Sequence, residues 1–205
     1  MNKIDQAAVA LFKAKAAPVS IFLTEVKGLT EAMDYAVEVC EKKEPFRPLL
    51  ASSAAPDVPA APGVPVKIMA APELSEPDFL KLTQKGGAKG FSVIRDGLRR
   101  HLAGIDVGFT EADLALADTA TSVLACQRED TRLATMICEI HVMALAKSKI
   151  APDSARAENF LNELMKSGVM YTAFISGCSR TSDIERVLTL GVHGPLELHV
   201  ALMEE

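Results

Sequence analysis

The sequence predicts a single α/β domain, spanning residues 1–205, in which a mainly parallel sheet is flanked by helices. The length of 205 residues suits one domain with a sizeable core. An apolar share of 49% is ordinary for a globular protein. In the second half, runs rich in β-formers alternate with helical patterns, as is typical of a parallel sheet covered by helices.

The first half predicts a helix, a strand and a second helix. Residues 2–16 place apolar side chains on one face, which indicates an amphipathic helix within residues 1–17. That face either packs on the core or docks a partner. Residues 19–26 predict a strand, and Thr30 can cap a helix that runs to about Lys42.

A proline-rich stretch then interrupts the pattern. Eight of the eleven prolines fall between Pro45 and Pro77, where a compact helix cannot form. We therefore expect a Pro/Ala-rich flap at residues 53–65. The elements expected around and after it are short strands at 49–52 and 66–70 and helices at about 75–85 and 91–102.

The second half supplies most of the predicted sheet. Its expected strands are 114–117, 122–126, 141–146, 170–176 and 198–202, and its expected helices are 131–138, 153–167 and 182–189. Ligands of such sheets bind beyond the carboxyl ends of the strands. The turns that follow strands are therefore where we look for a site.

Charge and hydropathy exclude several classes of function. With 22 Lys+Arg against 27 Asp+Glu, the net charge is −5, which argues against non-specific nucleic-acid binding but not against a small anion in a local basic pocket. The most apolar window, residues 135–146, is short and contains Glu139 and His141. No secretory signal is visible, so we expect a cytoplasmic protein without membrane insertion.

The cysteines and histidines predict no metal site. The four cysteines show no CxxC spacing and the four histidines no HxxxH spacing, so neither zinc nor an iron–sulfur cluster is expected on this chain. Buried free thiols are the expectation. No dinucleotide fingerprint or nucleophile elbow is present, and we expect no cofactor bound by this chain.

A first candidate turn combines a carboxylate with hydroxyl groups. Asp118, Thr119 and Thr121 lie between two predicted strands. They could recognise an anion or a hydroxyl, with Asp118 orienting a substrate hydroxyl or acting as a base. Alternatively, the turn only satisfies its own backbone.

A second candidate turn follows the strand that ends near residue 176. Ser182 and Glu185 have capping-box spacing, which predicts a helix start beside Arg180. A helix N-terminus and a guanidinium together favour a carboxylate or phosphate. A capped helix with a solvated arginine is the alternative. The candidate ligand-binding residues of this turn are Gly177, Ser179, Arg180, Thr181, Asp183 and Glu185.

A third candidate turn leads into the last strand. His193 could be an acid, a base or a hydrogen-bond donor there, with Gly194 beside it, or it could be a turn residue without a role. Arg132 faces either the same cleft or solvent. His141 begins an apolar strand, and we expect it to be a satisfied core histidine.

These turns carry a resemblance to a known family. Residues 109–121 resemble the LUD domain pattern T-x-A-D followed by A-E-T-G-T, and residues 132–136 and 139–142 resemble its next helix and strand. Residues 176–185 and 191–200 resemble its closing signature, G-P-S-R-T-x-D-I-E and then G-x-H-G-P-x-E. The departures are Asp118 for Glu, Ala120 for Gly and Cys178 for Pro, whereas the following match fully: Arg180, Thr181, Asp183, Glu185, His193 and Gly194.

The resemblance implies a fold and a role. The fold would be akin to the ribose-phosphate isomerase and CoA-transferase superfamily, and the role would be oxidation of L-lactate to pyruvate within a three-component system. Iron–sulfur clusters are then expected on partner proteins. Since this chain shows no redox motif, the leading hypothesis is a subunit that binds a small anionic ligand, with His193 and Asp118 handling a proton or a hydroxyl.

Two alternatives remain. The first is a non-catalytic assembly or regulatory protein, which would use residues 1–17 and the flap as contact surfaces. The second is a stand-alone enzyme acting on a phosphorylated or CoA-linked metabolite, an idea that rests on fold analogy.

Overall fold

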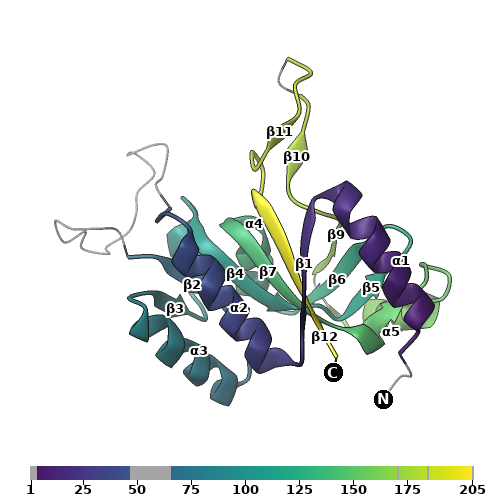
Figure 1. The fold of residues 1–205 in the computed structure, drawn as a ribbon, viewed down its shortest axis with the longest axis horizontal. Helices are drawn as coiled ribbons and strands as arrows, with labels where there is room; N and C mark the ends of the chain where they lie inside the picture. The colour runs from purple at the N-terminus through teal and green to yellow at the C-terminus, as the bar shows by residue number, and fades with distance from the viewer. Residues whose placement is uncertain (1–3, 47–65, 170, 184, 205) are drawn as a thin grey trace.

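The computed structural model describes residues 4–46, 66–169, 171–183 and 185–204. A central sheet runs through the molecule, with helices against both faces and a smaller sheet on one side (Figure 1). The predicted α/β class is confirmed, and every strand pair of the central sheet is parallel. The expected flap at 53–65 and the strand at 49–52 lie outside the described residues.

The central sheet has six strands, in the order β1-β12-β7-β4-β2-β3. Its middle strands are buried on both faces, as parallel strands covered by helices must be. The strands are β1 (Ile21–Val26), β12 (Glu197–Met203), β7 (Cys138–Ala146), β4 (Ile105–Glu111), β2 (Ile68–Ala70) and β3 (Ser92–Ile94).

Five helices cover this sheet and its neighbour. Helices α2 and α3 share one apolar cluster with β4, β7 and β12, whereas α1 shares another with β7, β12 and the smaller sheet. These two clusters lie on opposite faces of the central sheet (Figure 1). The helices are α1 (Gln6–Ala16), α2 (Leu29–Lys42), α3 (Glu76–Ala88), α4 (Glu129–Met136) and α5 (Glu158–Lys166).

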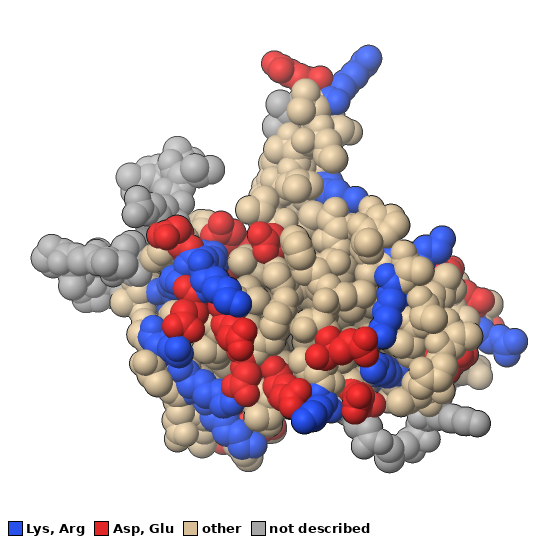
Figure 2. Space-filling view, viewed as in Figure 1, with Lys and Arg blue, Asp and Glu red and all other residues tan. Residues whose placement is uncertain are grey.

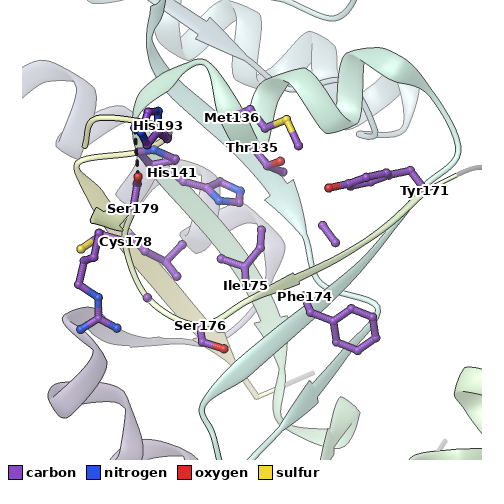
Figure 3. A pocket seen from close by; sticks show the side chains of 16 residues that line it. Thr135, Met136, His141, Tyr171, Phe174, Ile175, Ser176, Cys178, Ser179 and His193 are labelled. Carbon is purple, nitrogen blue, oxygen red and sulfur yellow. Dashed lines mark hydrogen bonds between the residues drawn. The ribbon is translucent and has the colours of Figure 1, made fainter. Parts of the chain in front are cut away.

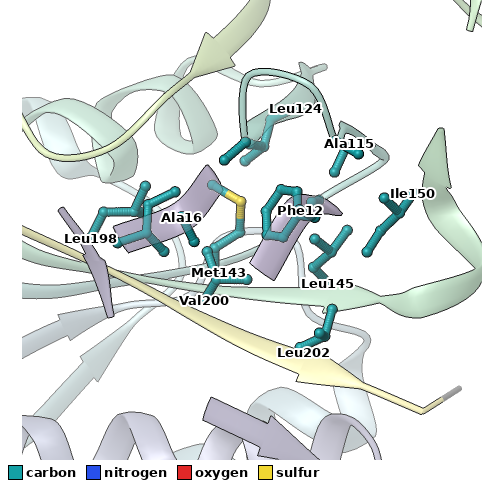
Figure 4. Close-up of a cluster of buried hydrophobic side chains, with 14 of the residues drawn as sticks. Phe12, Ala16, Ala115, Leu124, Met143, Leu145, Ile150, Leu198, Val200 and Leu202 are labelled. Atoms are coloured by element: carbon teal, nitrogen blue, oxygen red, sulfur yellow. The ribbon is translucent and has the colours of Figure 1, made fainter. Parts of the chain in front are cut away.

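Helix α1 packs on the core, which resolves the two expectations for the N-terminal helix. Asp5 caps it by accepting hydrogen bonds from the amides of Ala7 and Ala8. Phe12 is fully buried and lies against Met143 of β7 and the smaller sheet (Figure 4). Burying a phenylalanine contributes about 2 kcal/mol.

The smaller sheet was not expected. It contains β8 (Ile150–Ala151), β5 (Leu114–Leu116), β6 (Thr121–Cys126) and β9 (Tyr171–Ile175), in that order. Strands β5 and β6 form an antiparallel hairpin, because four residues are too few for the crossover that a parallel pair needs. The prediction that they belong to the parallel sheet is wrong.

Two helix predictions are also wrong. Residues 91–102 form β3 and a short 3-10 turn, separated by Gly97, which has φ +75°. The described residues of 182–189 form no helix, because Glu185 and Arg186 both have positive φ and the apolar side chains of Val187 and Leu188 are exposed rather than packed. Instead, β10 (Arg180–Thr181) pairs with β11 (Thr189–Leu190) in a projecting hairpin, which we call the arm, residues 180–190 (Figure 1).

No helix within the described ranges combines the length and apolar character that crossing a bilayer requires.

Candidate functional site

A pocket of about 370 Å³ lies between the central sheet and β9 of the smaller sheet (Figure 3). Helix α4 and the first residues of β7 form one wall, and β9 with the turn that follows it forms another. The turn before β12 closes the pocket. The pocket therefore lies at the amino ends of β7 and β12, opposite the edge that we expected to hold a ligand.

Two of the three candidate turns meet here. The amide of Ser179 donates to the carbonyl of Pro195 at 2.8 Å, and the amide of His193 donates to Ser179 Oγ at 3.3 Å. Figure 3 shows this second bond at the top of the pocket. The predicted residues that line the pocket are Gly177, Ser179, Arg180, His193 and Gly194.

Gly177 sets the path of the chain from β9 into the pocket wall. Its φ is +87°, which L side chains rarely adopt. A Cβ atom built there would lie 2.0 Å from the carbonyl oxygen of Val19, which precedes the first residue of β1 by two positions. Only glycine satisfies both constraints, so this position holds Ser179 and Arg180 in place.

Arg180 begins the arm and is exposed. The expected helix N-terminus beside it does not exist, so no helix dipole contributes to anion binding there. Its guanidinium forms no ion pair with another described residue. The other candidates of this turn lie along the arm, outside the pocket lining: Thr181, Asp183 and Glu185.

The first candidate turn lies outside the pocket but is connected to it by hydroxyl groups. Thr119 donates to Asp118 at 3.3 Å, and its oxygen lies 2.7 Å from that of Thr121. Thr121 in turn lies 2.6 Å from the hydroxyl of Ser176, which lines the pocket. Asp118 itself is exposed and does not line the pocket, so its connection to the pocket runs through these hydroxyl groups.

Ala120 takes the backbone conformation that a glycine would favour. Its φ is +48°, and its methyl group is fully buried. Alanine disfavours a positive φ, and the packing of the buried methyl group offsets this preference here. The departure from the family pattern is accommodated, at a conformational cost of about 1 kcal/mol.

Arg132 lies next to the pocket without lining it. Its guanidinium is 5.4 Å from the ring centroid of Tyr171, a pocket residue, and 3.3 Å from the carboxylate of Glu129. The guanidinium thus packs over the Tyr171 ring, and the carboxylate of Glu129 partly offsets its positive charge.

His141 lines the pocket, and the expectation that it is a satisfied core histidine is right about its burial but wrong about its hydrogen bonds. It is fully buried, its Nε2 lies 2.8 Å from Thr110 Oγ1, and its Nδ1 has no hydrogen-bond partner among the described residues. Burial lowers its pKa to about 4, so the ring is neutral near pH 7. The sequence signal was a histidine within an apolar strand, which needs a partner on each ring nitrogen.

The pocket lining favours an anion. It contains one arginine and two histidines, and none of its described residues is an aspartate or a glutamate. A second cavity of about 310 Å³ adjoins it and shares Met136, His193 and Gly194. His193 therefore lies where the two cavities meet.

Glu139, the carboxylate that lines the second cavity, forms an ion pair with a buried lysine. Glu139 lies 2.9 Å from Lys43 Nζ, which also lies 2.7 Å from Asp106. Although burial lowers the pKa of Lys43, hydrogen bonds to both carboxylates raise it above its ordinary value. One lysine faces two carboxylates, so the cluster keeps a net charge of −1, and Glu139 is its member that lines the second cavity with His193.

The thiols of Cys40 and Cys138 are poor nucleophiles, and no metal site is evident in the described part of the chain. All four cysteines are buried and unpaired, and burial raises the pKa of Cys40 and of Cys138 to about 12. No group of three His, Cys, Asp or Glu side chains is close enough to hold an ion among these residues.

Comparisons with known proteins agree on one family. The family model described as LUD domain matches residues 9–203. Lactate utilization protein C of Geobacillus sp. (strain WCH70) is 33% identical over 95 residues, or 45% of this chain and 39% of that protein. Lactate utilization protein C of Bacillus subtilis (strain 168) is 28% identical over 103 residues, 49% of this chain and 43% of that protein. The matched segments thus span well under half of these relatives.

The fold has a solved counterpart. A crystal structure of a DUF162 family protein from Deinococcus radiodurans superposes with a TM-score of 0.62 and covers 96% of each chain. At 15% identity, this likeness shows a shared fold and nothing about the ligand.

Proposed function

The chain belongs to the LUD domain family, and from this premise we propose that its pocket binds the carboxylate of a small organic acid during bacterial L-lactate oxidation. Its relatives named lactate utilization protein C support the pathway. The observation that carries the proposal is the pocket lining, which has an arginine and two histidines and no acidic residue among those described.

The size and the polar groups of the pocket suit such an acid. A volume of about 370 Å³ lies at the lower end of the range for small-molecule sites. The guanidinium of Arg180 can bind a carboxylate with two parallel hydrogen bonds, and Ser179 can donate a third. His193, at the junction of the cavities, would exchange a proton with the ligand.

Oxidation of L-lactate to pyruvate also releases two electrons. We propose that they pass to iron–sulfur clusters on partner proteins and that this chain is the cluster-free subunit. Asp118 would accept a proton through Thr119, Thr121 and Ser176, since their hydroxyl groups form a continuous hydrogen-bonded chain.

Isothermal titration calorimetry tests the proposal. L-lactate, pyruvate, phosphate and CoA are titrated into the protein, into Arg180→Ala and into Arg156→Ala. Arg156 is also exposed but does not line the pocket, so it controls for the loss of a surface charge. We expect L-lactate and pyruvate to bind, and we expect Arg180→Ala to lower their affinity roughly tenfold or more. Absence of carboxylate binding, or equal binding by both variants, would refute the proposal.

A second candidate function is assembly of the oxidation system, and the arm favours it. Val187 and Leu188 on the arm are 60% and 66% exposed. The stem of the arm is largely uncharged, whereas basic and acidic side chains interleave over α2 and α3 (Figure 2). Exposed apolar side chains on a projecting hairpin are typical of contact surfaces.

Co-purification separates the two functions. If assembly is the role, Val187→Asp combined with Leu188→Asp abolishes co-purification of cluster-containing partners and Arg180→Ala does not. Retention of the partners by the arm variant would rule out this surface.

A further inference from the structure

We infer that His141 donates a hydrogen bond from Nδ1 to an oxygen on the carbon next to the ligand's carboxylate, and thereby selects 2-oxygenated acids over unsubstituted ones. The inference rests on the proposed function and adds the chemical class of the ligand. It begins from an unpaired polar atom at the pocket.

The unpaired atom is Nδ1 of a ring that has no access to bulk water. His141 is fully buried, and Nδ1 is without a hydrogen-bond partner among the described residues. In Figure 3 the imidazole projects into the middle of the lining side chains, near Thr135 and Ile175. Leaving such a group unpaired costs about 1–3 kcal/mol, and a ligand atom that pairs with it recovers that free energy.

Thr110 determines that Nδ1 is a donor. A hydroxyl has one proton to donate. Among the described side chains and carbonyls, the acceptor for the hydroxyl proton of Thr110 is His141 Nε2, at 2.8 Å. Donation from Thr110 to Nε2 satisfies both buried groups. The ring proton is then on Nδ1, which is a donor without an acceptor among the described residues.

The neutral ring favours an uncharged oxygen. Because burial holds the pKa of His141 near 4, the ring adds no positive charge that would attract the carboxylate itself. The charged guanidinium of Arg180 is the better partner for the carboxylate. A hydroxyl or keto oxygen on the neighbouring carbon is left for His141.

Three buried side chains of the lining offer no equivalent donor. Leu198 and Ala173 are apolar and buried, and the hydroxyl of Thr135 already donates to the carbonyl of Arg132 at 2.8 Å. A hydrogen bond in such surroundings is stronger than one in water. An acid that has only hydrogen atoms at that carbon would leave Nδ1 unpaired.

Two variants separate the two ring nitrogens. His141→Gln places an amide near the position of Nε2, where it can still bond to Thr110, but it offers no donor at the position of Nδ1. His141→Asn places its amide near the position of Nδ1 and loses the contact with Thr110. Both variants remove the ring, so thermal unfolding of each is measured as a folding control.

The experiment compares L-lactate and pyruvate with propionate by calorimetry. We expect the protein to bind the two 2-oxygenated acids about tenfold more tightly than propionate. We expect His141→Gln to abolish this preference and His141→Asn to retain most of it.

The outcomes separate this inference from the proposed function. Propionate bound as tightly as L-lactate, or a preference that survives in His141→Gln, would overturn the role of His141 and leave a carboxylate site. Failure of all three acids to bind would overturn the proposed function and this inference with it.

Discussion

Acid titration of His141 should reveal how deeply the pocket histidine is buried. Its pKa falls from 6.5 to about 4 because burial disfavours the charged ring. As the pH drops below 6.5, the unfolded chain takes up a proton at this position before the folded protein does. The stability that the neutral ring provides is therefore complete above about pH 6.5 and is lost as the pH falls toward 4.

The magnitude follows from the two pKa values. The difference between 6.5 and about 4 corresponds to about 3 kcal/mol when the pH has fallen past both values. Between about pH 7.5 and about pH 5, most of that titration has occurred in the unfolded chain, and the expected loss is about 2 kcal/mol. No discount for solvent screening applies, since the ring is fully buried.

Urea unfolding of the protein and of His141→Gln at these two pH values measures the effect. Carboxylates contribute equally to both proteins, so the difference between their losses isolates His141. We expect the protein to lose about 2 kcal/mol more than the variant. Equal losses, or a nuclear magnetic resonance titration of His141 near 6.5, would refute the burial on which the argument depends.

Two further predictions concern the structure around the pocket. Gly177→Ala should destabilise the protein by at least about 2 kcal/mol in urea unfolding, because of its positive φ and the nearby carbonyl of Val19. Gly87→Ala, in the last turn of α3 where a Cβ meets no other atom, should stabilise the protein by up to about 1 kcal/mol, and similar effects of the two substitutions would contradict the geometry. Asp106→Ala should cost about 3–5 kcal/mol in the free energy of unfolding, because it removes one carboxylate from the buried Lys43. Glu129→Ala, at a surface ion pair with Arg99, should cost much less, and an equally small loss for Asp106→Ala would show that the ion cluster is not structural.

Periodic apolar runs were sufficient to predict several strands and the class of the fold. The runs at 122–126 and 198–202 are apolar apart from Ser122 and His199, and both are strands. Strand β4 was missed because Asp106 and Gly108 disfavour strands. Tertiary contacts explain why these two residues occur in the strand. Asp106 accepts hydrogen bonds from two backbone amides and Lys43, and a Cβ on residue 108 would lie 2.2 Å from the carbonyl oxygen of Ala134.

The turns of the candidate site could be predicted from the sequence, but the unpaired state of His141 could not. Ser179 and His193 stood out because hydroxyl, basic and glycine residues gathered in short turns, and the structure joins those turns. The capping-box spacing also predicted a helix after Arg180. That prediction was wrong, because a local spacing does not show whether a helix would find an apolar surface to pack on. His141 could not be identified as unpaired from sequence, because only the packing decides which of its nitrogens finds a partner.

A crystal structure of the protein grown with saturating L-lactate tests the central claim most directly. We predict electron density for the acid in the pocket at the amino ends of β7 and β12, with its carboxylate on Arg180 and Ser179 and its hydroxyl oxygen within hydrogen-bond distance of His141 Nδ1. Lactate bound at the carboxyl ends of the central strands, or a pocket without ligand at a concentration that saturates binding in solution, would contradict the account.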